Sequence, residues 1–114
     1  MQAVLDPETA MHTEFSAPFV VRASGDVDLA AAPRLRRDLA HALAAHHDVV
    51  LDLSEVEFMD CAGLGALVEA LNQADRQGRR LALRGTGPRV ARLLELTGLH
   101  RRLAARPRTA PSRR

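Results

Sequence analysis

The pair Asp60 and Cys61 places a carboxylate beside the one thiol of this 114-residue chain, at the start of a helical pattern. A helix N-terminus favours the thiolate, which is the nucleophilic and oxidation-prone form of cysteine. The neighbouring carboxylate opposes that effect, and the sequence places no histidine where it could serve as a base. Catalysis is therefore disfavoured, so we expect that the chain is not an enzyme. A redox-sensing thiol and a small structural thiol remain as alternatives.

Other residues with chemical potential form weaker patterns. His41, His46 and His47 could ligate a metal, but adjacent residues on a helix point in different directions. The segment 85–87 has two glycines but lacks the third glycine of a dinucleotide-binding loop, which favours a simple strand-to-helix turn. All 16 basic residues are arginine, and both the Walker A loop and Schiff-base chemistry need a lysine amine. We expect no metal site and no cofactor.

Charge and hydropathy indicate the cellular compartment of the chain and the kinds of partner that it is expected to lack. Residues 101–114 hold six arginines and no acid, whereas residues 1–100 hold ten arginines and fourteen acids, a formal charge of −4. The net charge of +2 therefore gives little support to direct nucleic-acid binding. No apolar run approaches the roughly 20 residues that span a bilayer, and no signal peptide is visible. The single cysteine suits a reducing compartment, so we expect a cytoplasmic protein without a membrane span.

The stretch from Asp48 to Ala70 supplies the element that positions Asp60 and Cys61. A short apolar run over residues 49–53 predicts a buried strand. After a connection, apolar residues recur at the helical spacing i, i+3, i+4, i+7, at Leu64, Leu67, Val68 and Leu71. Asp60 is a good N-cap, and Gly63 and Gly65 are expected to leave the first turn without bulk, so that a partner can approach the backbone.

Strands and helices alternate along the rest of the chain, which predicts one α/β domain over residues 13–105 with mostly parallel pairing. Residues 1–12 are expected to be loose, and the Arg- and Pro-rich residues 106–114 to be disordered. The remaining predicted strands are 13–16 and 19–23 as an antiparallel pair, 81–83, and a short final strand at 101–105. The predicted helices are 31–45, one that runs to about Arg76 before Gly78, and one that starts near Pro88 and ends near Gly98.

The motif LDLSEVEFMDCAGLGAL, residues 51–67, resembles the signature of the STAS domain, in particular that of the bacterial anti-sigma factor antagonists. A second stretch, residues 25–28 (Gly-Asp-Val-Asp), is similar to the family's Gly-Glu-Leu-Asp. The resemblance covers about residues 13–100. It implies a STAS-like single domain, with a small mixed β-sheet of four to five strands and about three to four α-helices.

The resemblance also implies a partner and a set of contact residues. The partner would be an anti-sigma factor of the histidine-kinase-like serine kinase type, or another kinase-like regulatory protein. The implied contact residues are Asp28, Asp60, Cys61, Ala62, Gly63, Leu64 and Gly65. In the family, phosphorylation of the serine that follows the motif aspartate prevents binding. Cys61 occupies that position here and Ala62 follows it, so no hydroxyl is left in the turn and this off-switch is expected to be absent.

Two alternatives remain at this point. The chain could be a STAS subunit of another cytoplasmic assembly, such as a phospholipid transporter, or a redox-sensing thiol protein that uses Cys61. The oligomeric state is left open, with a homodimer among the choices.

Overall fold

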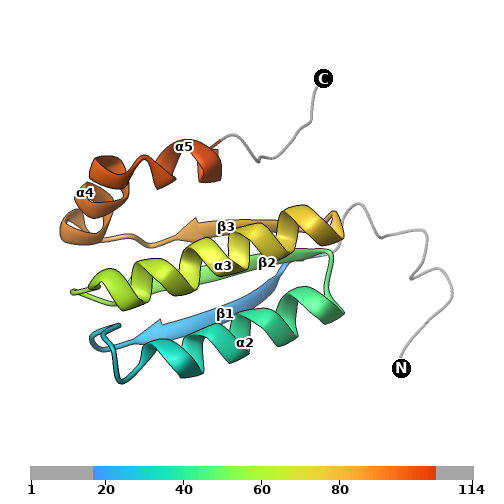
Figure 1. The fold of residues 1–114 in the computed structure, drawn as a ribbon, viewed down its shortest axis with the longest axis horizontal. Helices are drawn as coiled ribbons and strands as arrows, with labels where there is room; N and C mark the ends of the chain where they lie inside the picture. Colours follow the sequence, from blue (N-terminus) through green and yellow to red (C-terminus); the bar gives the residue numbers. More distant parts are fainter. Residues whose placement is uncertain (1–16, 105–114) are drawn as a thin grey trace, which may run out of the picture.

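The computed structural model describes residues 17–104, which form a three-stranded sheet with helices packed against it (Figure 1). The elements in chain order are β1 (Phe19–Ser24), α2 (Ala32–Ala45), β2 (Asp48–Glu55), α3 (Cys61–Gln77), β3 (Arg80–Arg84), α4 (Pro88–Thr97) and α5 (Leu99–Ala104). The strands pair in the order β1-β2-β3, and both pairings are parallel. No helix of these residues is long and apolar enough to cross a bilayer.

The core lies between the sheet and the pair of helices α2 and α3. Each of these helices is the crossover between two neighbouring parallel strands, so both lie on the same face of the sheet (Figure 1). Val21, Leu51 and Leu83 stand in register across the three strands, and Leu51 is fully buried. Leu39 of α2 and Leu71 of α3 are also fully buried in the same cluster. The apolar strand and the helical stripe predicted from the sequence thus build one core.

The predicted helices are confirmed, with ends that differ by one or two residues. Glycines end two of them as expected, because Gly78 (φ +66°) and Gly98 (φ +80°) adopt the left-handed conformation after α3 and α4. Pro33 lies in the first turn of α2. The N–H groups of a first turn have no acceptor within the helix, so the missing N–H of proline breaks no helical hydrogen bond there.

The sheet differs from the prediction in two respects. Within residues 17–104 it has three parallel strands, not a mixed set of four to five. The predicted strand at 13–16 lies outside the described residues, as do the segments 1–12 and 106–114. The predicted final strand at 101–105 is wrong, because residues up to Ala104 form helix α5. Leu99 and Leu103, four residues apart, both pack on the core, and that spacing suits a helix.

Asp52 is a buried acid on the strand face opposite the core, and its neighbours keep it ionised. It stands in register between Arg22 of β1 and Arg84 of β3. The Ser54 backbone N–H donates to its Oδ1 at 2.9 Å, and Arg84 Nε donates to its Oδ2 at 3.2 Å. The Ser54 hydrogen bonds, followed by that of Arg84, lower the pKa of Asp52 from its ordinary 3.8 to about 2.

We therefore expect Asp52 to contribute to acid stability. A carboxyl group with a lowered pKa stabilises the fold above its unfolded-state value, and this contribution disappears as the pH falls from about 4 to about 2. The variant Asp52→Asn should show a shallower fall of melting temperature over that window than the native chain. Parallel slopes for the two proteins between pH 4 and pH 2 would contradict this assignment.

Candidate functional site

Two loops at the carboxyl end of the sheet run side by side and bring the two predicted acidic motifs together. One follows β1 and carries Asp28, and the other follows β2 and leads to Asp60. The Val27 backbone N–H donates to the Phe58 carbonyl at 2.9 Å, and the Asp60 N–H donates to the Val27 carbonyl at 3.2 Å. Val27 and Met59 also form an isolated parallel β-bridge. The two motifs, more than thirty residues apart in sequence, therefore form one edge.

Asp60 and Asp28 each hold the start of a helical segment. Asp60 Oδ1 accepts hydrogen bonds from the backbone N–H groups of Ala62 (2.8 Å) and Gly63 (3.2 Å), which confirms it as the N-cap of α3. Asp28 Oδ1 accepts from the N–H groups of Ala30 and Ala31, both at 3.1 Å, in the turn that leads into α2. Both carboxylates are half-buried and committed to these backbone contacts.

Cys61 is the first residue of α3, and its thiol is free and exposed. Ala62 and Leu64, in the same turn, are half-buried. Leu64 follows Cys61 by three residues, so the two side chains share a helix face. The sequence of residues 58–67 contains no hydroxyl side chain. Within the described residues, no three potential metal ligands gather in one place.

Gly63 is needed for close packing between elements, whereas Gly65 is not, so the two glycines differ in how far they leave the turn open. Gly63 is buried, and a Cβ there would lie 2.6 Å from Met59 Cγ and 2.7 Å from the Val27 carbonyl oxygen. Gly65 faces α2, where a Cβ would lie 3.5 Å from Arg36 Nη2. The predicted turn is thus partly an internal contact, and its outer face is formed by Cys61 and its half-buried neighbours.

The structure adds two apolar side chains that the sequence analysis did not assign to the site. Leu29 is 77% exposed and directly follows Asp28, and Phe58 is 44% exposed and precedes Asp60 by two residues. The signal in the sequence was the position of an apolar residue in a polar loop next to each acidic motif. The next residue, Met59, is instead buried in the core.

The two loops are also acidic. Asp26, Glu55 and Glu57 are exposed, and none of them has an ion-pair partner among residues 17–104. We call this surface the carboxyl edge. It consists of Asp26, Asp28, Leu29, Glu55, Glu57, Phe58, Asp60, Cys61, Ala62 and Leu64. Exposed apolar groups beside unpaired acids suit a protein contact better than chemistry on a small molecule.

Comparison with known proteins identifies a family and a similar protein. Residues 7–112 match the family model of the STAS domain. An anti-sigma-B factor antagonist of Staphylococcus epidermidis is 32% identical over 96 residues, which cover 83% of this chain and 86% of the relative.

Solved structures agree with this likeness. An anti-sigma factor antagonist from Mycobacterium paratuberculosis is similar with a TM-score of 0.61 and 30% identity, over 82% of this chain and 76% of that one. The STAS domain of a SulP transporter from Vibrio cholerae is similar with a TM-score of 0.61 and 25% identity, over 84% of this chain and 77% of that one.

Proposed function

The chain belongs to the STAS domain family, and on that premise we propose that it is an anti-sigma factor antagonist. It would bind an anti-sigma factor of the serine kinase type in the cytoplasm and so release a sigma factor. The relatives that carry this name support the proposal, and so does the carboxyl edge. The observation that carries most weight is the exposure of Leu29 and Phe58 on the two loops that the family motifs form. The protein would act by binding and not as an enzyme.

The contact would centre on the first turn of α3. Cys61, Ala62 and Leu64 offer an uncharged outer face there, while Asp28 and Asp60 hold the loops in place through their backbone hydrogen bonds. Gly63 would contribute indirectly, because it lets this turn lie close to Val27, and Gly65 would add no bulk to the turn. A partner that covers the turn would also meet Leu29 and Phe58.

The test is a titration of the purified chain against each kinase-type anti-sigma factor of the same genome. We expect one of them to bind and to release its sigma factor. Leu29→Asp should weaken that binding about tenfold or more, because it places a charge in an apolar contact. Leu96→Asp is the matched control, since Leu96 is 71% exposed on α4 and is not one of the residues of the carboxyl edge. Equal affinities for the two variants, or no binding by any of the anti-sigma factors, would contradict the proposal.

Cys61 stands where the family has its phosphorylated serine, so we expect that phosphorylation at this position does not prevent partner binding. Incubation with the partner kinase and ATP should add no phosphate to residues 58–67, because that segment carries no hydroxyl group. Intact-mass analysis followed by peptide mapping measures this directly. Cys61→Ser is the positive control, as it returns an acceptor to the exposed first position of α3 and should gain a phosphate. A mass gain mapped to this segment in the native chain would refute the prediction.

A second candidate is a STAS subunit of a membrane transporter, favoured by the structural likeness to the SulP transporter domain. In that case the native chain would co-purify with a membrane-embedded subunit, and none of the anti-sigma factors would bind it.

A further inference from the structure

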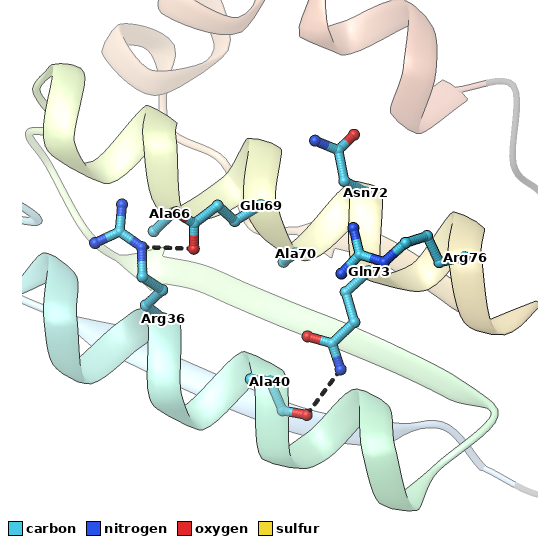
Figure 2. A pocket seen from close by; sticks show the side chains of 8 residues that line it. All are labelled: Arg36, Ala40, Ala66, Glu69, Ala70, Asn72, Gln73 and Arg76. Atoms are coloured by element: carbon cyan, nitrogen blue, oxygen red, sulfur yellow. Dashed lines mark hydrogen bonds and ion pairs between the residues drawn. The ribbon is translucent and has the colours of Figure 1, made fainter.

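A shallow groove runs between α2 and α3 on the side of the helices that faces away from the sheet (Figure 2). Its volume is about 200 Å³, and alanines line it on both sides, Ala40 from α2 and Ala66 and Ala70 from α3. These small side chains leave the space between the helices unfilled. Gln73 bridges the groove, with its Nε2 donating to the Ala40 carbonyl at 3.1 Å.

The groove carries an unneutralised positive charge. At one end, Arg36 Nε lies 2.8 Å from Glu69 Oε1, so these two charges offset each other. At the other end, Arg76 is exposed and has no ion-pair or hydrogen-bond partner among residues 17–104. Figure 2 shows its guanidinium directed back along α3 toward Gln73. A cation in the last turn of α3 also suits the helix dipole, so the position alone does not establish a contact.

The groove is continuous with the carboxyl edge. Arg36 reaches across to the first turns of α3, next to Gly65, and Gly65 lies four residues after Cys61. From Gly65 to Arg76 the helix rises about 16 Å. A partner patch of ordinary size, about 800 Å² per side, would cover both regions. The two regions differ in charge, because the loops carry unpaired acids and the far end of the groove carries an unpaired arginine.

We propose that this groove receives an acidic side chain, Asp or Glu, of the anti-sigma factor, and that Arg76 pairs with it. The inference rests on the proposed function and deepens it. A partner carboxylate at Arg76 would lie at one end of the interface and the carboxyl edge at the other. This pairing would fix the orientation in which the partner docks, since complementary charges set register and suppress wrong partners.

The test compares charge reversal at two exposed arginines, Arg76→Glu and Arg92→Glu. Arg92 lies on α4 and, like Arg76, has no partner among the described residues. The probe is the anti-sigma factor that binds the native chain. We expect Arg76→Glu to weaken binding about tenfold at low salt, with a smaller loss at high salt, and Arg92→Glu to change affinity less than twofold. Arg76→Gln should fall between the native chain and Arg76→Glu.

Charge swapping identifies the partner residue. An Asp→Arg or Glu→Arg change in the anti-sigma factor should restore binding to Arg76→Glu, and equal affinities of Arg76→Glu and Arg92→Glu would overturn the inference. The outcome for Cys61→Asp separates the two proposals. If Cys61→Asp weakens binding and Arg76→Glu does not, the function stands and the groove contact is refuted. If neither variant weakens binding, the groove contact and the placement of the interface at the first turn of α3 are both refuted, whereas absence of binding by the native chain would refute the proposed function itself.

Discussion

Gly63→Ala should lower the free energy of unfolding by about 3 kcal/mol, at the upper end of the usual range for overpacking. A Cβ at this position would lie 2.6 Å from Met59 Cγ, 2.7 Å from the Val27 carbonyl oxygen and 2.9 Å from Val27 Cγ1. The Met59 side chain could turn away, but the Val27 carbonyl is backbone and accepts the Asp60 N–H. The new methyl group must therefore push the two loops of the carboxyl edge apart.

Thermal unfolding measures this effect. For a domain of this size, about 3 kcal/mol corresponds to a fall in melting temperature on the order of 10–20 °C. Gly65→Ala is the control in the same helix turn, because its Cβ would lie 3.5 Å from the flexible end of Arg36 and meet no closer atom. Alanine forms helix more readily than glycine by roughly 1 kcal/mol, so Gly65→Ala should be neutral or stabilising. Similar melting temperatures for Gly63→Ala and the native chain would show that the loops can separate without loss.

The different roles of these two glycines show where sequence reasoning stops. Both stand in the first turn of an amphipathic helix, and from spacing alone they are equivalent. What separates them is which neighbour lies opposite, Val27 for Gly63 and Arg36 for Gly65, and both neighbours are distant in sequence. Periodicity gives the buried face of a helix, but it does not give the element that packs on that face.

The fold followed the same division between local and distant information. The strand through Leu51 and the helix stripe through Leu67 and Leu71 were predictable, because each is a local pattern of apolar residues. The last helix of the described residues was not predictable in this way. Leu99 and Leu103 form too short a pattern to separate a strand from a helix, and the turn at Gly98 carries them onto the core as helix α5.

The acidic motifs of the site were predictable from sequence, whereas its apolar part was not. Asp60 as an N-cap follows from residue type and position. Leu29 and Phe58 belong to the site because the loop after β1 pairs with the loop after β2, through Val27 and Met59. Their exposure depends on how that bridge turns each side chain, and a single sequence does not contain this information.

Cys61→Asp should abolish binding to the anti-sigma factor and leave the fold intact. Cys61 is exposed at the first position of α3, so a carboxylate there needs no burial in the free protein. The helix dipole favours a negative charge at this end by roughly 0.3–1 kcal/mol, which offsets repulsion from Asp60. In the complex the same carboxylate would be desolvated on an apolar face shared with Leu64. An unpaired buried charge costs several kcal/mol, which corresponds to at least about a hundredfold loss of affinity.

Cys61→Asn isolates the charge, because asparagine has nearly the shape of aspartate without the ionised oxygen. Its affinity should stay within about tenfold of the native chain, and all three proteins should melt at similar temperatures. A Cys61→Asp variant that melts normally and binds as tightly as the native chain, or more tightly, would show that the partner does not cover this turn with apolar groups. Equal losses for Cys61→Asp and Cys61→Asn would attribute the effect to size, and the charge-based explanation of the missing off-switch would then be wrong.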